Sequence, residues 1–216
     1  MTVFNKAYAF KLAPNTLKRN PAKALTGVVV LGLSTLGFTA CSSTADVLQI
    51  GDAATKTNSG PCPRAFALYD AARIVDFGGQ PEQFANIRFT GEVDSIRSLC
   101  RYYDTEPIEA DLEIQLSLGR GPAAGQASAT YEYFVAVTRK NIDVINKQVF
   151  PLSVTFPTGA DRVTVTERID RIVIPRGSET TSGENFEIIT GFVVTPEQRQ
   201  FNAEGKRFRV SAGQNK

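Results

Sequence analysis

Apolar and polar residues alternate strictly over one long stretch of the chain. From Ile108 to Leu118 every even-numbered residue is apolar and every odd-numbered residue is charged or polar. Side chains of a β-strand point to opposite faces in turn, so a period of two predicts a strand with one buried face. Residues 87–100 alternate in the same way until the phase slips near Ser95, which predicts a second strand bent by a bulge.

Four further segments are rich in β-branched and aromatic residues, which favour strands, and are separated by Gly, Pro and Ser. They are 130–139, 148–156, 162–174 and 185–194. Pro151 lies inside one of them, and because proline donates no backbone hydrogen bond we expect an edge strand there, or a break. A last short strand is expected at 208–210.

Helix signals are sparse. Residues 65–77 fit either a short strand followed by an extended segment or one helix, and the strand is favoured. The clearest helix begins at Thr195, where threonine can cap, Pro196 takes the first helical position and Gln198 completes a capping box. We expect this helix to end near Ala203.

These elements predict one all-β domain over residues 62–212, an immunoglobulin-like antiparallel β-sandwich with one short C-terminal helix. Six to eight strands with turns between them and almost no helix argue against an α/β fold. A small barrel is the alternative. The length of 216 residues suits one domain with a small appendage.

The first forty residues have the pattern of a secretion signal. Residues 1–23 hold five basic residues and no acidic one, and residues 24–40 carry no charge. The uncharged stretch is short for a membrane-spanning helix, which needs about 20 apolar residues, but suits a signal peptide. An uncleaved anchor, or ordinary cleavage near Ala40, remains the alternative.

The segment Phe38–Thr39–Ala40–Cys41 resembles the lipobox of bacterial lipoproteins. That resemblance implies a lipoprotein signal peptide over residues 1–40 and an acylated Cys41 at the mature N-terminus. Residues 41–61 are rich in Ser, Thr, Gly and Asp and are predicted to form a flexible tether. By analogy with bacterial sorting, Ser42 favours the outer membrane, with the domain facing the periplasm.

Composition narrows the function further. The chain has no histidine, which excludes Ser-His-Asp triads, Cys-His dyads and histidine-based metal sites. Loss of residues 1–40 removes five of the 24 basic residues, so 19 basic residues face 22 acidic ones and the mature net charge is −3. A nucleic-acid partner is therefore not expected.

Two cysteines remain once Cys41 is assigned to lipid. In an oxidising compartment Cys62 and Cys100 are expected to form a disulfide, which would stabilise the domain by roughly 4 kcal/mol in the loop-closure description. A metal site is not expected, because two cysteines without histidine supply only half of a tetrahedral shell. Two buried free thiols are the alternative.

Three groups of residues are candidates for chemistry, and each has a structural interpretation that is favoured. The acidic cluster is a candidate calcium site, but its spacing fits a solvated sheet face better. The tyrosines are candidates for ligand binding, but they fit the core better. The basic residues are candidates for contact with lipid phosphates, but they fit a mixed, solvated surface better. They are Asp104, Glu106, Glu109, Asp111 and Glu113; Tyr102, Tyr103, Tyr131 and Tyr133; and Arg168, Arg171, Arg176, Lys206, Arg207 and Arg209.

The leader, the lipobox, the cysteine pair with CPRAFALYDAARI and the TPEQ segment together resemble the envelope lipoproteins of Gram-negative bacteria that carry one β-rich periplasmic domain. The resemblance implies location, without catalytic residues or cofactor. We expect a membrane-anchored, non-enzymatic binding or scaffolding module whose sheet faces or edge strands, such as 148–156, contact another envelope protein. The alternatives are a carbohydrate-binding or carboxylate-dependent hydrolytic domain and a purely structural lipoprotein. The sequence does not indicate the oligomeric state.

Overall fold

The computed structural model describes residues 2–3 and 58–208. Cys41, nearly all of the predicted signal peptide and most of the predicted tether lie outside the described residues. Within the described part, no helix has the length and apolar character needed to cross a bilayer. The last four tether residues, 58–61, already contact the domain, since Ser59 N donates to Tyr102 O at 3.2 Å.

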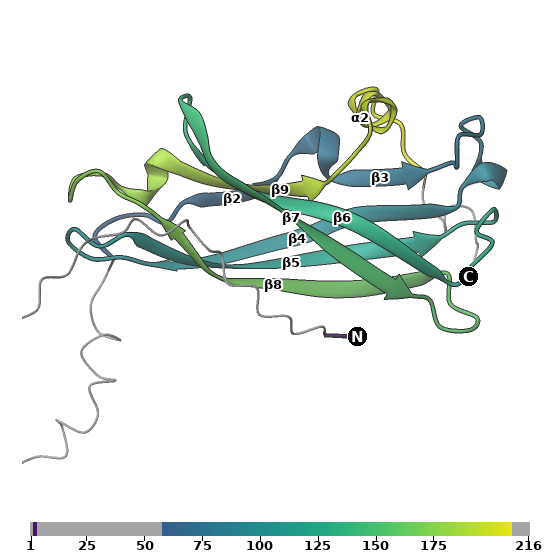
Figure 1. Ribbon diagram of the computed structural model, residues 1–216, viewed down its shortest axis with the longest axis horizontal. Coiled ribbons are helices and arrows are strands. Elements are labelled where there is room, and N and C mark those ends of the chain that lie inside the picture. The colour runs from purple at the N-terminus through teal and green to yellow at the C-terminus, as the bar shows by residue number, and fades with distance from the viewer. Residues whose placement is uncertain (1, 4–57, 209–216) are drawn as a thin grey trace, which may run out of the picture. The chain divides into compact units, whose positions relative to one another are not determined.

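Two sheets pack face to face (Figure 1). Sheet A has the order β1-β8-β5-β4-β3 and sheet B the order β2-β9-β6-β7. Among the described strands, β1–β8 and β2–β9 pair in parallel and the other pairs are antiparallel. This confirms the predicted antiparallel β-sandwich with a short C-terminal helix. The elements are β1 (Thr2–Val3), β2 (Arg64–Ala67), β3 (Arg73–Asp76), β4 (Phe89–Arg101), β5 (Ile108–Arg120), β6 (Ser128–Arg139), β7 (Asp143–Thr155), β8 (Arg162–Ile174), β9 (Phe186–Phe192) and α2 (Pro196–Ala203).

Three short 3₁₀ turns connect these elements. They are η1 (Tyr69–Ala71), η2 (Phe84–Asn86) and η3 (Gly183–Asn185). The turn η1 carries the chain from β2 in sheet B to β3 in sheet A. Segment 65–77 therefore begins as a strand, as favoured, and not as a helix, but a turn and a second short strand replace the expected extended segment.

The core lies between the inner faces of the two sheets. All six apolar positions from Ile108 to Leu118 are at most 2% exposed, which confirms the alternation in β5. Sheet B contributes Tyr131, Tyr133 and Phe192 from its inner face. Gly91 on β4 is required by this packing, because an added Cβ would lie 2.7 Å from Cζ of Phe192.

Two sequence signals of irregular strands are confirmed. The register between β4 and β5 shifts between Val93 and Ser95, where the alternation slips. β7 lies at the edge of sheet B, as Pro151 indicated. Glu132, the partner of Pro151 on β6, turns its carbonyl toward Val193 N at 2.8 Å, so Pro151 directs its missing donor to the open edge.

Helix α2 covers the edge of β3. Its predicted capping box is present, with Thr195 and Gln198 each accepting a hydrogen bond from the other's backbone N–H. Side-chain amides of the helix then bond the β3 edge: Asn202 Nδ2 donates to Arg73 O at 2.8 Å and Gln198 Nε2 donates to Val75 O at 3.1 Å. The helix thereby takes the place of a neighbouring strand.

A disulfide and a polar network tie together the end of the domain opposite the β3–β4 connection. Cys62 and Cys100 are bonded, with Cα atoms 5.7 Å apart, as predicted. Tyr102 is 1% exposed, and its hydroxyl donates to Pro61 O at 2.8 Å and accepts from Gly183 N at 3.1 Å. Arg176 lies over the Tyr102 ring, 4.7 Å from its centroid.

The predicted strand 208–210 is not confirmed. Phe208 is described and lies outside any strand, whereas Arg209 and Val210 are outside the described residues. Phe208 instead packs with Phe77 and Phe201 in a small apolar cluster beneath α2.

Candidate functional site

The acidic row on β5 has the solvent-facing arrangement that its alternation predicted. Glu113 pairs with Arg168 at 2.9 Å, Glu109 with Arg171 at 3.5 Å, and Asp111 Oδ1 accepts from Arg171 N at 2.9 Å. These cross-strand contacts hold the carboxylates side by side along the sheet. Among residues 2–3 and 58–208, no group of three or more His, Cys, Asp or Glu side chains is placed to hold a metal ion.

Three of the four candidate tyrosines belong to the core. Tyr102, Tyr131 and Tyr133 are at most 5% exposed, and Tyr103 is half-buried. Tyr133 donates to Oε2 of the buried Glu167 at 3.0 Å, and Tyr131 donates to Thr90 O at 3.0 Å. Burial raises the pKa of Tyr131, and the carboxylate of Asp76 adds to the increase. The core interpretation of these tyrosines is therefore confirmed.

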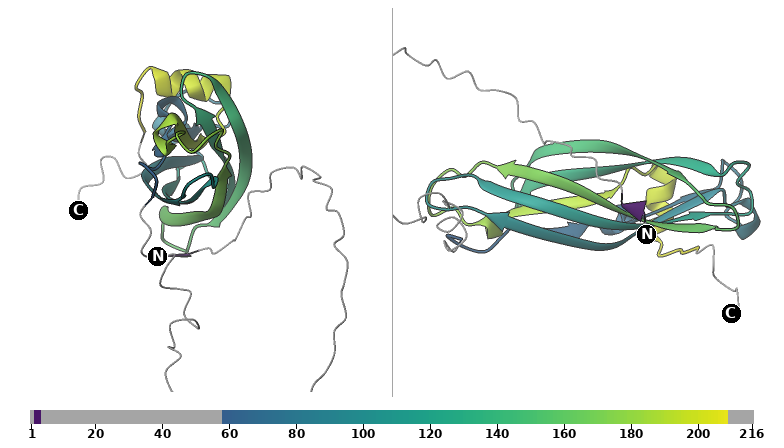
Figure 2. Two further views of the ribbon diagram at one scale, coloured as in Figure 1. Left: turned by 90° about the vertical axis from the view of Figure 1, so that its left-hand side faces the viewer. Right: turned by 90° about the horizontal axis from the view of Figure 1, so that it is seen from below.

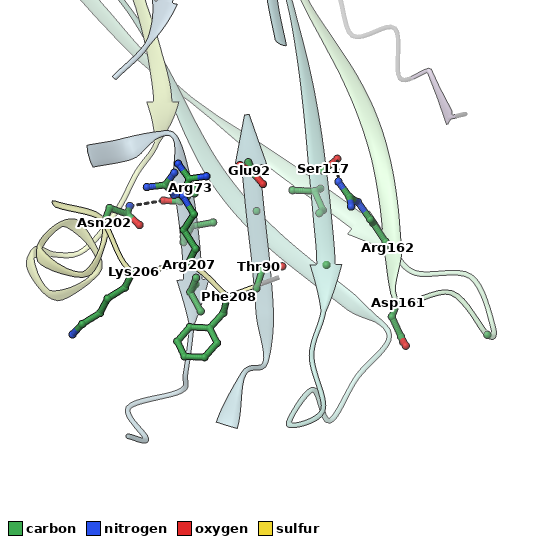
Figure 3. A pocket seen from close by; sticks show the side chains of 16 residues that line it. Arg73, Thr90, Glu92, Ser117, Asp161, Arg162, Asn202, Lys206, Arg207 and Phe208 are labelled. Carbon is green, nitrogen blue, oxygen red and sulfur yellow. Dashed lines mark hydrogen bonds between the residues drawn. The ribbon is translucent and has the colours of Figure 1, made fainter. Parts of the chain in front are cut away.

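A pocket of about 230 Å³ opens on the outer face of sheet A (Figure 3). Strand register builds its floor from two rows that run across the strands. The first row is Arg73–Glu92–Ser117 and continues to Thr164, which does not line the pocket; the second row is Val75–Thr90–Gly119–Arg162. Each row crosses three strand spacings, or about 14 Å. Because Gly119 has no side chain, the second row has a depression at its middle.

The segment after α2 forms one wall of the pocket. Asn202, Lys206, Arg207 and Phe208 line it. Asn202 is 1% exposed and also donates to Asp70 O at 2.8 Å, so it fixes the end of α2 against η1 and β3. The wall is therefore anchored at the helix.

Arg73 is the unusual member of the pocket. Its Nε and Nη2 atoms are buried and have no hydrogen-bond partner among residues 2–3 and 58–208. The two N–H groups lie on one edge of the planar guanidinium, the edge that binds two oxygens of a carboxylate or phosphate. The guanidinium carbon lies 5.3 Å from the centroid of the Tyr69 ring, a contact that leaves both N–H groups without acceptors.

The rim charges are engaged elsewhere. Lys206 pairs with Glu82 and Glu204 at 2.7 Å each, and hydrogen bonds to Glu204 and then Glu82 raise its pKa. Asp161 pairs with Arg120 at 3.0 Å. In Figure 3 both Lys206 and Asp161 point away from the other labelled side chains.

The opposite side of the pocket carries a second arginine. Arg162 Nη2 donates to Ser117 Oγ at 2.8 Å, and Ser117 donates a short hydrogen bond to Asp94. Figure 3 shows Arg162 and Ser117 on one side of Glu92 and Arg73 on the other. A ligand in the pocket would therefore meet guanidinium groups on both sides, with a carboxylate between them.

The candidate basic residues fall into three groups. Arg168 and Arg171 pair with the acidic row on β5, and Arg176 bonds backbone carbonyls at the disulfide end. Lys206 and Arg207 line the pocket, whereas Arg209 is outside the described residues. The structure thus separates residues that the sequence grouped only by charge.

Sequence reasoning missed Arg73, Glu92, Ser117 and Arg162. They lie on four strands, and only the register brings them together. Arg73 stands within the CPRAFALYDAARI segment, but no spacing in that segment indicates a site.

Fold and pocket together define a β-sandwich domain with a pocket on an outer sheet face. A scan against protein-family models, a search of the curated proteins and a search of the solved structures each returned no match.

Proposed function

We propose that the chain is a lipid-anchored protein of the cell envelope whose sandwich binds a small anionic ligand in the pocket beside Arg73. The observation that carries the proposal is the buried guanidinium edge, Nε and Nη2, which has no hydrogen-bond partner in the part of the chain that the structure describes. Buried polar groups in folded proteins are nearly always paired, and an unpaired one costs about 1–3 kcal/mol. A ligand that supplies acceptors recovers that energy.

The geometry of the donors favours an oxyanion. A carboxylate or phosphate presents two oxygens at the spacing of the two N–H groups, and such charge-assisted bonds are stronger than neutral ones. Because both nitrogens are shielded from solvent, we expect the guanidinium to turn toward the pocket on binding, or the wall of residues 206–208 to shift.

The rest of the floor favours a ligand that also carries hydroxyl groups. Thr90 supplies a hydroxyl group on the floor of the pocket, which can both donate to and accept from the hydroxyl groups of a ligand. The ligand class that combines both features is a sugar acid or a sugar phosphate. This proposal narrows the expected binding module toward the carbohydrate-binding alternative.

A binding role is favoured over hydrolysis by the placement of the pocket's two acids. Carboxylate-dependent glycosidases hold two carboxyl groups on either side of the bond that is cleaved. Glu92 and Asp161 both line the pocket, but Asp161 pairs with Arg120 and points away. We therefore propose a non-enzymatic role.

The anchor rests on the lipobox-like segment that ends at Cys41. The test is the intact mass of the protein extracted from membranes. We expect a chain that begins at an acylated Cys41 and lacks the two hydrogens of the Cys62–Cys100 thiols. A chain that retains residues 1–40 without acylation would contradict the anchor.

Ligand binding is tested by thermal unfolding of the full-length protein in detergent with galacturonate, glucose 6-phosphate, inorganic phosphate or galactose. A ligand at 100 times its Kd stabilises the folded state by about 2.7 kcal/mol. We expect stabilisation by galacturonate or glucose 6-phosphate and none by the neutral galactose. Stabilisation by phosphate alone would limit the ligand to a simple oxyanion.

Arg73→Met should abolish the stabilisation. The matched control is Arg168→Met, because Arg168 also lies on sheet A but is already paired with Glu113. Equal stabilisation of the Arg73 variant and the control, or no stabilisation by any anion, would refute the site.

A further inference from the structure

Exposed apolar side chains gather on the hairpin formed by β6 and β7. Of nine large hydrophobic residues that are exposed in the described part of the chain, four fall between residues 142 and 149. Ile142 is 68% exposed, Val144 54% and Ile145 37%. Figure 1 shows the turn between β6 and β7 projecting from the neighbouring strands, and Figure 2 gives two further views.

The same hairpin is positively charged. Residues 139–149 contain Arg139, Lys140 and Lys147 against the single acid Asp143, a net charge of +2, although the mature chain is predicted to carry −3. All three basic residues are exposed. Lys147 Nζ lies 4.5 Å from the centroid of the Phe134 ring, on the neighbouring strand.

Apolar and basic side chains at one tip are the combination that binds the surface of an anionic bilayer. The apolar side chains enter the boundary between headgroups and acyl chains, and the cations stay at the headgroup phosphates. We propose that the β6–β7 tip, residues 139–147, is a second membrane contact that takes a bilayer containing anionic phospholipid. The inference rests on the proposed function for the lipid anchor.

The anchor explains why a small contact would suffice. The predicted tether between Cys41 and the described domain is residues 42–57, and a flexible chain of that length spans about 22 Å on average. Once the acyl chains are in the bilayer, the tip meets the same surface at high effective concentration. Weak insertion of a few side chains would then orient the domain on the membrane.

The edge of β7 beyond the tip does not favour a protein strand as the occupant. Pro151 faces the open edge without a donor, so an added strand would miss a hydrogen bond there. The tip has more basic than acidic residues and no aromatic residue, so its surface is not complementary to a basic peptide. The positive charge of the tip and the exposure of its apolar side chains therefore favour an anionic bilayer as its binding partner.

Tryptophan fluorescence gives a direct test, because the chain contains no tryptophan. The mature, acylated protein with Ile142→Trp is reconstituted into phosphatidylcholine vesicles, with or without phosphatidylglycerol, and with brominated acyl chains as quenchers. We expect a blue-shifted, quenched indole in the anionic vesicles and a weaker effect in phosphatidylcholine alone. High salt should reduce the difference.

The matched control is Phe84→Trp. Phe84 is 43% exposed and lies on the connection between β3 and β4, which Figure 1 shows at the other end of the sheets. Its indole should keep the emission of an exposed residue in both kinds of vesicle. In the Ile142→Trp background, changing Arg139, Lys140 and Lys147 to Gln should remove the preference for anionic vesicles.

Vesicle flotation separates failure of the tip from failure of the anchor. An Ile142→Trp protein that floats with the vesicles while its indole stays exposed and unquenched retains the anchor but overturns the tip contact. A protein without acyl chains fails the anchor, and its tip is still tested at high vesicle concentration: quenching there supports the tip, and its absence overturns it. Equal quenching of the indoles in the Ile142→Trp and Phe84→Trp proteins would also overturn it.

Discussion

Arg176 and Arg73 are both half-buried arginines that lie over a tyrosine ring, yet their hydrogen bonding is opposite. Arg176 donates to four backbone carbonyls, those of Asp104, Glu106, Glu179 and Thr181, and joins two loops at the disulfide end. The Nε and Nη2 atoms of Arg73, beside the pocket, have no hydrogen-bond partner within the described residues. The Arg176 guanidinium stabilises the fold, whereas the Nε–Nη2 edge of the Arg73 guanidinium makes no hydrogen bond to the described residues.

This contrast identifies function better than charge or exposure does. Both residues are arginines, both are partly buried, and each lies over a tyrosine ring, at 4.7 Å for Arg176 and 5.3 Å for Arg73. They differ in whether the N–H groups of the guanidinium have hydrogen-bond acceptors. Removing each in turn should therefore give opposite results for stability and for ligand binding.

The largest effect is expected from the disulfide at the Arg176 end. Changing Cys62 and Cys100 together to Ser should lower the free energy of unfolding by about 4 kcal/mol, because the bond closes a loop with a sequence separation of 38. Urea unfolding of the full-length protein measures it. The single change Cys41→Ser is the control and should leave the midpoint of unfolding unchanged.

Arg176→Met should follow, with a loss of about 2–4 kcal/mol, since charge-assisted bonds are lost and carbonyls of two loops lose their donor. The same urea titration measures it. Arg168→Met, which removes one exposed pair with Glu113, should change the value by about 0–1 kcal/mol. Equal effects of the two changes would contradict a structural role for Arg176.

In the absence of ligand, Arg73→Met should leave the free energy of unfolding unchanged or raise it by about 1 kcal/mol, because the substitution removes buried N–H donors that have no acceptor. A loss comparable to that of Arg176→Met would mean that Arg73 is structural after all. This result would break the comparison even if a ligand were found.

The smallest effect concerns Tyr131, whose hydroxyl lies under the pocket floor. Burial raises its pKa above the ordinary value near 10, so above pH 10 the unfolded chain releases this proton more readily than the folded one. Its contribution to stability is present below pH 10 and is lost as the pH rises toward its folded pKa. Absorbance titration of the wild type and Tyr131→Phe should differ by one late-ionising phenol, and identical curves at high pH would contradict this.

Much of the fold could be predicted because local patterns encode it. Alternation located β5, the phase slip near Ser95 located the bulge in β4, and Thr195 with Gln198 located α2. The sequence predictions did not include a second bulge, in β8, although the step of three between the buried Ile169 and Ile172 indicates it. Arg171 at that bulge has a φ of 61°.

The pocket could not be predicted because its neighbours are set by strand register. Arg73 faces Glu92 across β3 and β4, and Glu92 faces Ser117 across β4 and β5, but no local pattern states which residues of separate strands are opposed. Unpaired donors are a property of three-dimensional surroundings. The sequence shows that residue 73 is an arginine, but it does not show which of its N–H groups have hydrogen-bond acceptors.

The most direct test of the central claim is the NMR signal of the Arg73 Nε–Hε group in the full-length protein in detergent, assigned by its absence in Arg73→Met. We expect galacturonate or glucose 6-phosphate to move this signal and to slow its hydrogen exchange, while the signal of Arg176 stays in place. An Arg73 signal that no anion changes, at concentrations that saturate any thermal stabilisation, would contradict it.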